Sequence, residues 1–345
     1  MALYDAVNME LVEELRKEYE SIFEDGSGKM KANTGKVHEY LGMTLDYSEK
    51  GVVKVSMPKY IKELLSDFAK IMPDATGTKQ TAAPKNLFTV KEDCEKLSKE
   101  KAEQYHSLVA KILFATKRAR PDTGLALSYL MTKTSAPDKD DWAKLEHLMG
   151  YIKETKDLPL ILGADKEWIS RWMIDGAHAV HPNMRGHSGA GLTFGRGFPL
   201  SASSKQKLNT RSSTESELVA VDDNMPDVLW CRQFLAEQGI KLKQNIVYQD
   251  NQAAILLEKN GKASSGKRTK HINTRYFFVT DRISKGELEV VWCPTEDMTG
   301  DFWTKLLQGA LFRRFRDLIM GVTTFRKPRG PKSDKRKKSE RPAKK

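Results

Sequence analysis

The chain has 345 residues, of which 39% are hydrophobic and 30% are charged, a length and composition that suit two globular domains. No apolar run approaches the roughly 18 residues of a membrane-spanning helix, so a membrane protein is not expected. The cysteines Cys94, Cys231 and Cys293 are far apart, which speaks against a disulfide framework or a thiolate zinc site and favours an intracellular protein, cytoplasmic or nuclear. The first 15 residues lack the pattern of a secretion signal, and no targeting peptide is expected.

The net charge of +12 is concentrated at the end of the chain. Residues 326–345 hold eleven Lys and Arg against Asp334 and Glu340, a balance of +9 that leaves +3 for the rest. Such a segment has almost nothing to bury, and we expect a disordered basic tail over 323–345. It could attract phosphates or serve as a nuclear address, or it could simply be solvated.

The first 72 residues predict a helix, a β-hairpin and a second helix. Apolar residues recur at helical spacing over 11–23. Two alternating runs, 41–47 and 53–57, flank a turn at 48–51 and predict the hairpin. Pro58 suits the first turn of the following helix.

Residues 73–157 predict a mostly helical region. The polar stretch 70–104 favours an exposed connector with weak structure, and helical patterns follow at 108–113 and 142–152. The sequence Lys156-Asp157-Leu158-Pro159 favours a domain boundary, because the pattern then changes to strands.

The region after residue 158 alternates between strand and helix patterns. Strands are expected at 168–175, 189–194, 199–205, 246–250 and 288–293. Helices are expected from 212 until Pro226 interrupts them, again around 229–234, at 251–257, at 267–283, and from about 296 onward through Asp301.

Two of these strands end on aspartates, Asp175 and Asp250. A strand reached through helices is normally parallel to its neighbour, so both aspartates should lie at the same edge of the sheet, where open α/β sheets bind ligands. Taken singly, an aspartate at a strand end often only begins a turn.

At this point the sequence resembles a known family, the Pol polyproteins of copia-type LTR retrotransposons. The ribonuclease H domain of that family is matched over 168–307 and the end of its reverse transcriptase region over 9–154. The strings that carry the resemblance are, in order, EYLGMTLDYS, YHSLVAKILFATKRARPD, WMIDGAHAVHPNMRGHSGAGLTFGRG, SKQKLNTRSSTESELVA, YQDNQAAI, KRTKHINTRYFF and CPTEDMTGDFWTKLL.

The resemblance implies an α/β fold with a ribonuclease H-like mixed five-stranded sheet and helices, preceded by a mostly helical remnant of a reverse transcriptase palm and thumb with one β-hairpin. The implied segments are a palm remnant at 1–72, a thumb-like or connection-like region at 73–157, a ribonuclease H-like domain at 158–322 and the basic tail at 323–345.

The resemblance also implies four metal-binding, catalytic carboxylates: Asp175, Glu217, Asp250 and Asp301. Hard oxygen ligands select Mg²⁺, with Mn²⁺ as a substitute, and two such ions could hold a phosphodiester between them. The implied reaction is hydrolysis of the RNA strand of an RNA:DNA hybrid.

Alternative roles exist for two of these carboxylates. Glu217 could instead close a capping box with Thr214, and Glu215 could take its place at the metal. Asp301 could merely favour a helix N-terminus.

Several other residues are expected to contact the hybrid. Lys205, Lys207 and Arg211 could bind the phosphate backbone, and His271 could contact phosphate or protein. By resemblance, Thr214, Asn251 and Gln252 meet sugars and base edges, where the 2′-hydroxyl distinguishes RNA from DNA. The histidines His178, His181 and His187 are interpreted as surface loop residues.

The sequence departs from the family at some positions. Gly176 stands where alanine is usual, a change that looks tolerable. A paired aspartate of the Tyr-x-Asp-Asp type, which holds the polymerase metals in reverse transcriptases, is missing, and Val221-Asp222-Asp223 lies in the expected helix after Glu217 instead of in a β-hairpin. DNA synthesis by this chain alone is therefore not expected, although an upstream reverse transcriptase fragment could be a partner. The alternative to a nuclease is a catalytically inactive, nucleic-acid-binding remnant.

Overall fold

The structure is a computed structural model that describes residues 6–22, 35–261 and 273–328. The chain divides into two units, Met1–His38 and Glu39–Lys345. The first unit contains the helix α1 (Ala6–Ile22), as the apolar spacing predicts. All further elements except the start of β1 belong to the second unit.

Within the described residues the chain is a mixed α/β protein with nine α-helices and two five-stranded sheets. The remaining helices are α2 (Pro58–Ile71), α3 (Lys99–Thr116), η1 (Pro121–Thr123), α4 (Gly124–Met131), α5 (Lys139–Glu154), α6 (Ser213–Glu237), α7 (Gln252–Asn260), α8 (Asn273–Ser284), η4 (Thr295–Asp297), η5 (Thr299–Trp303) and α9 (Gly309–Ile319). The strands are β1 (Val37–Tyr40), β2 (Met43–Asp46), β3 (Val52–Ser56), β4 (Leu160–Ala164), β5 (Ile169–Ala177), β6 (His187–Thr193), β7 (Gly195–Arg196), β8 (Leu200–Lys205), β9 (Gln244–Gln249) and β10 (Glu289–Trp292). None of the helices in the described ranges is both long and apolar enough to cross a membrane.

The first sheet has the strand order β1-β2-β3-β4-β7. Its β2 and β3 pair antiparallel, which confirms the predicted hairpin. β3 also pairs antiparallel with β4, with Val55 opposite Leu160, and β4 pairs with β7. This sheet therefore joins strands from both sides of the expected boundary at residue 157, and the division of the chain into four segments stays a prediction.

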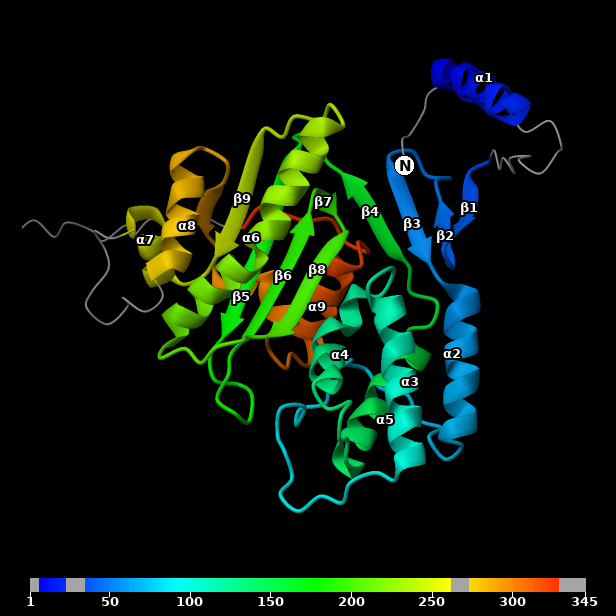
Figure 1. Cartoon of the computed structure of the whole chain (residues 1–345), viewed down its shortest axis with the longest axis vertical. Helices are drawn as coiled ribbons and strands as arrows, with labels where there is room; N and C mark the ends of the chain where they lie inside the picture. Colours follow the sequence, from blue (N-terminus) through cyan, green and yellow to red (C-terminus); the bar gives the residue numbers. More distant parts are fainter. Residues whose placement is uncertain (1–5, 23–34, 262–272, 329–345) are drawn as a thin grey trace, which may run out of the picture. The chain divides into compact units, whose positions relative to one another are not determined.

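The helices α2 to α5 form a layered group below this sheet in Figure 1. Ser98 caps α3 through its side chain, and Asp138 with Asp141 forms a capping box at the start of α5, which fixes where both helices begin. The expectation of an exposed connector over 70–104 is wrong in part. Leu87 is completely buried in this stretch. A few apolar side chains are enough to hold an otherwise polar segment against a neighbouring core.

The second sheet is mixed, with the order β10-β9-β5-β6-β8, and confirms the expected five strands. β5 pairs parallel with β9, and β9 with β10, whereas β5, β6 and β8 form an antiparallel meander. Figure 1 shows α6 lying across this sheet. The side chains on the α6 side, among them Trp172, Ile174 and Val228, form a core of their own.

The opposite face of the second sheet is covered by η5. The Trp303 side chain is buried, and its indole N–H donates a 3.0 Å hydrogen bond to the Pro121 carbonyl oxygen. A Cβ atom at Gly191 would lie 2.3 Å from the Trp303 ring, so this glycine makes the close packing possible. The segment that carries Asp301 is thereby fixed against the sheet.

Two helix expectations are corrected. Pro226 does not end a helix: α6 is continuous, because Met225 and Val228 are buried around the proline and their packing outweighs one lost backbone hydrogen bond. Asp301 does not lie in a long helix. It lies in the short 3₁₀ helix η5. A Cβ atom built on Gly300 would lie 3.1 Å from the Asp175 Cβ atom, so this segment packs tightly against β5 and leaves little room for a wider helix.

Candidate functional site

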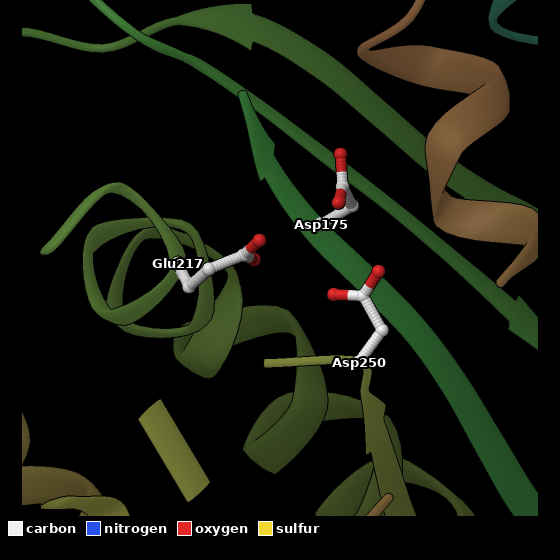
Figure 2. A group of neighbouring side chains, drawn as sticks. All are labelled: Asp175, Glu217 and Asp250. Carbon is white, nitrogen blue, oxygen red and sulfur yellow. The ribbon is translucent and has the colours of Figure 1, made fainter. Parts of the chain in front are cut away.

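Three carboxylates from separate elements converge at the edge of the second sheet. Asp175 lies on β5, Glu217 on α6, and Asp250 directly follows β9. One oxygen atom from each lies within 4.8 Å of the others, and Figure 2 shows the three groups pointing toward a common point. Asp175 and Glu217 are buried, and Asp250 is half-buried. The structure thus brings together three of the four carboxylates named from the sequence.

The strand register explains why the two aspartates meet. Met173 pairs with Tyr248 in the parallel β5–β9 ladder, and Asp175 and Asp250 each lie two residues further along their chains. Parallel strands place equivalent positions at the same edge, so the two carboxylates come to one side of the sheet.

The start of α6 decides between Glu215 and Glu217. The N-cap is Ser212, whose hydroxyl accepts the Glu215 backbone N–H at 3.2 Å, and the Glu215 carboxylate accepts the Arg211 N–H at 2.7 Å. Glu215 therefore has the capping role, and Thr214 does not form a capping box with Glu217. Glu217 follows half a turn later and faces the two aspartates.

Each of the three carboxylates is oriented by a hydrogen-bond donor. Gly176 donates its backbone N–H to Glu217 Oε2 at 2.8 Å, and the Thr295 hydroxyl donates to Asp250 Oδ2 at 3.0 Å. The Thr304 hydroxyl donates to Asp175 Oδ2. The other oxygen of Asp175 is buried and has no hydrogen bond among the described residues, but the Lys305 ammonium lies 3.4 Å from it.

These observations test whether the site suits a cation. Three carboxylates packed this closely repel one another unless a cation compensates them, and three hard oxygen donors form a ligand set typical of Mg²⁺ or Mn²⁺. The residues present therefore fit a divalent metal ion.

Burial and repulsion by neighbouring carboxylates raise the pKa values of Glu217 and Asp250. Burial, followed by the charges of Asp175 and Asp250, holds the pKa of Glu217 well above its usual range. Burial and the charge of Asp175 also raise the pKa of Asp250. Both carboxyl groups thus resist ionisation in the metal-free protein, and a bound divalent ion would reverse this.

Asp301, the fourth predicted carboxylate, lies outside the group of three and is linked to it through Lys305. The Lys305 ammonium is 2.8 Å from Asp301 Oδ1 and 3.4 Å from Asp175 Oδ1. Burial, and then repulsion by Asp175, raises the pKa of Asp301 to about 8. Burial alone would lower the pKa of Lys305, but the negative charges of Asp175 and Asp301 outweigh burial and raise this pKa. The sequence interpretation missed Lys305, although its position four residues after Asp301 was a usable signal.

An open pocket of about 440 Å³ lies beside the carboxylates. Asp175 and Glu217 line it together with Phe88, His178 and Lys305. Phe88 comes from the stretch expected to be an exposed connector, and sequence periodicity gave no signal for it. The pocket therefore gives access to two of the three acidic groups.

The predicted backbone-binding residues surround the start of α6. Lys205 ends β8 and is half-buried, whereas Lys207 and Arg211 are exposed in the loop before α6. Burial, and then repulsion by Arg185 and Lys133, lowers the pKa of Lys205. The side chains of Lys205, Lys207 and Arg211 form no ion pair within the part of the chain that the structure describes.

The residues expected at sugars and bases have mixed environments. Thr214 is half-buried on the first turn of α6. Asn251 caps α7, because its side-chain oxygen accepts the N–H groups of Ala253 and Ala254 at 3.0 and 3.1 Å. Gln252 is exposed at the start of α7, and His271 lies outside the described residues.

The interpretation of the histidines as surface residues is wrong for His181 and His187, which are buried. The Ser203 hydroxyl donates its proton to the Trp303 carbonyl oxygen, so it must accept the hydrogen bond from His187 Nε2 at 2.8 Å. The other ring nitrogen, His187 Nδ1, then accepts from His181 Nε2 at 2.9 Å. The Phe88 and His181 rings meet edge to face with ring centres 5.1 Å apart, which a loop pattern could not reveal. His178 is half-buried, with Nδ1 3.0 Å from Thr210 Oγ1.

No family model matches the chain, but several known proteins are similar to it. The chain is similar to the retrovirus-related Pol polyprotein from transposon TNT 1-94 of Nicotiana tabacum, with 26% identity over 271 residues that cover 77% of this chain and 20% of that protein. It is also similar to the corresponding polyproteins from transposons RE2 and RE1 of Arabidopsis thaliana, each with 27% identity, over 81% and 83% of this chain and 19% of each relative. The chain thus spans about a fifth of the length of these relatives. Its homologues are retrovirus-related Pol polyproteins of plant copia-type transposons, which confirms the resemblance found in the sequence motifs.

Proposed function

We propose that this chain, as part of a retrotransposon-derived Pol protein, hydrolyses the RNA strand of RNA:DNA hybrids with divalent metal ions. The convergence of Asp175, Glu217 and Asp250 within 4.8 Å carries this proposal. The mixed five-stranded sheet with α6 across it is compatible with a ribonuclease H-like fold, and the similarity to Pol polyproteins supports that interpretation.

In the proposed reaction a water oxygen bonds to the phosphorus and the bond to the 3′ oxygen breaks, which leaves a 3′-hydroxyl and a 5′-phosphate. Asp175, Glu217 and Asp250 would hold one cation, and Asp175 with Asp301 offers the carboxylates for a second. A bound Mg²⁺, or Mn²⁺ as its substitute, would supply Lewis-acid stabilisation of the charge that develops on the phosphate.

The residues around the carboxylates would prepare the site before substrate arrives. Gly176 and Thr295 hold Glu217 and Asp250 in place through single hydrogen bonds, which leaves a second oxygen on each carboxylate. Fixed ligand directions reduce the reorganisation needed on binding, as hydrogen-bond donors behind the ligands do in other metal sites.

The substrate class is supported by charge. Lys205 forms a basic cluster with Arg185 and Lys133, whose positive charges, after burial, lower the pKa of Lys205. Such a cluster is stabilised when phosphates bind, because each phosphate relieves the repulsion. Lys205 on β8 is the register partner of His187 on β6, and His187 is the partner of Ala177 on β5. Ala177 is two residues beyond Asp175, so the cluster is near the proposed reaction centre.

A cleavage assay tests the proposal. The purified chain is mixed with a hybrid that carries end-labelled RNA, either with Mg²⁺ or with a chelator. Asp250→Asn is the test variant, and Asp227→Asn, which changes an exposed carboxylate on α6, is the control. We expect Mg²⁺-dependent cutting of the RNA strand only, a loss of more than about 100-fold in Asp250→Asn, and no loss in the control.

The alternative of a catalytically inactive, nucleic-acid-binding remnant gives a different result in the same assay. Such a protein would bind the hybrid in a gel-shift experiment and leave the RNA intact at every metal concentration. That outcome would overturn the nuclease proposal.

A further inference from the structure

Lys305 occupies a position between two of the acidic groups of the site. Its ammonium nitrogen is 2.8 Å from Asp301 Oδ1 and 3.4 Å from Asp175 Oδ1. The Lys305 backbone N–H also bonds the Asp301 carbonyl oxygen at 2.8 Å, which holds the lysine one turn beyond the aspartate. A single cationic side chain thus offsets part of the negative charge of this pair of carboxylates.

Asp175 is shared between this pair and the group of three. Its Oδ2 accepts from Thr304, and among the described residues Lys305 is the cation that forms an ion pair with its Oδ1. Among the described residues Glu217 and Asp250 form no ion pair, whereas Asp175 and Asp301 both pair with Lys305. The site therefore has two adjacent cation positions of unequal charge.

We propose that Lys305 is a built-in cation at the Asp175–Asp301 pair, so that one divalent ion binds readily at the group of three and a second must displace the lysine. This inference rests on the proposed function, because it presupposes a metal ion at Asp175, Glu217 and Asp250. It adds that the occupancy of the second position is controlled by a side chain of the protein.

The physical basis is charge and mobility. A second divalent ion at this pair would meet the positive charge of Lys305 at close range, and like charges in a partly buried site repel strongly. The lysine side chain is 41% exposed and unbranched, so it can turn outward into water without opening the core. Its displacement costs the two ion pairs, which weakens the second ion but does not forbid it.

The test measures metal binding without substrate. Titration calorimetry with MnCl₂ gives the number of ions and their affinities for the full chain, for Lys305→Met and for Lys305→Arg, which keeps the charge. Lys285→Met serves as the control, because Lys285 forms an exposed ion pair with Asp281 at 2.9 Å.

We expect one well-bound Mn²⁺ in the unmodified chain, in Lys305→Arg and in the control. In Lys305→Met we expect two ions, with the second bound at least about ten-fold more tightly than in the unmodified chain. Circular dichroism verifies that each variant is folded. If Lys305→Met does not fold, Lys305→Gln replaces it. Asp301→Asn removes one carboxylate of the pair and should bind only the first ion at any Mn²⁺ concentration.

The possible failures are distinguishable. Equal numbers of ions and equal affinities with and without Lys305, in proteins that still cleave the hybrid, would overturn this inference alone. No Mn²⁺ binding in either protein, together with an uncut hybrid, would overturn both this inference and the proposed function.

Discussion

Gly176 donates its backbone N–H to Glu217 Oε2 at 2.8 Å, so the residue after Asp175 positions the carboxylate of Glu217. The contact between the two segments is very close. A Cβ atom at Gly176 would lie 2.3 Å from the Ser216 carbonyl oxygen and 2.8 Å from the Glu217 nitrogen. β5 and the first turns of α6 thus touch backbone to backbone, and only glycine permits this distance.

We expect Gly176→Ala to be destabilising, although alanine at this position looks harmless from the sequence. The added methyl group must push α6 away from β5, at a cost of about 1–3 kcal/mol, and the shift should also weaken Mn²⁺ binding through Glu217. Urea unfolding measures the loss. Gly77→Ala is the control, because a Cβ there meets nothing within 4 Å. Equal unfolding free energies for the two variants would contradict the close contact.

Replacement of Glu217 by glutamine should separate stability from metal binding. The substituted amide would keep an oxygen for the Gly176 N–H but remove a buried carboxyl group whose pKa is held high by burial and by Asp175. We expect the metal-free variant to melt at a higher temperature than the unmodified chain. The unmodified chain should gain about 2.7 kcal/mol from Mg²⁺ at 100 times its Kd, and Glu217→Gln should gain almost nothing. Thermal melts with and without Mg²⁺ measure both effects, and Glu103→Gln, an exposed change on α3, serves as the control.

Glu258 should make the stability fall as the pH rises from 4.5 to about 8. Both of its carboxylate oxygens are buried without hydrogen bonds, and burial raises the pKa from 4.5 to about 8. The folded protein keeps a proton that the unfolded chain releases, so the stability is full below pH 4.5 and falls as the pH rises toward 8. Glu258→Met should raise the unfolding free energy at pH 7 on the order of 3 kcal/mol and remove this decline.

Urea unfolding between about pH 4.5 and 8.5 tests this prediction. Glu103→Met, at an exposed position on α3, should follow the unmodified chain at every pH. A decline of equal slope in Glu258→Met would assign the pH dependence to other groups.

The buried histidine pair should act in the opposite direction, at low pH. Burial lowers the pKa of His181 and His187 from 6.5 to about 4 and about 3. Their contribution to stability is complete above pH 6.5 and is lost as the pH falls, because the unfolded chain takes up protons first. Each histidine contributes a slope of up to about 1.4 kcal/mol per pH unit.

His187→Leu should flatten this acidic limb, even though it lowers stability at neutral pH by removing the hydrogen bonds to His181 and Ser203. Acid unfolding followed by circular dichroism measures the slope. His106→Leu changes an exposed histidine on α3 and should leave the slope unaltered. If both variants have the same acidic limb, the buried pair is not its cause.

The sequence was sufficient to place two of the three converging carboxylates by topology alone. Asp175 and Asp250 follow apolar strand patterns, and the helices between them imply parallel pairing, which the β5–β9 ladder confirms. Glu217 came from the family resemblance. Local pattern could not separate it from Glu215, because both lie near a helix start, and only the observed cap at Ser212 does so.

The features that the sequence did not predict depend on contacts between distant segments. The continuity of α6 through Pro226 depends on packing against the sheet, and the burial of His181 depends on Phe88, almost a hundred residues earlier. Lys305 was overlooked because nothing local shows that its ammonium reaches Asp175, far upstream in the chain. Periodicity reports which face of an element is buried, but not what buries it.

The antiparallel pairing of β3 with β4 has a consequence for anyone who divides this protein into fragments. A fragment that begins at Leu160 would keep β4 and lose the neighbour that occupies its edge from Val52 to Val55. An open edge of this kind invites aggregation. We therefore expect the fragment that carries the three carboxylates to stay in solution on its own only when the hairpin 43–56 accompanies it, whether on the same chain or added as a separate peptide.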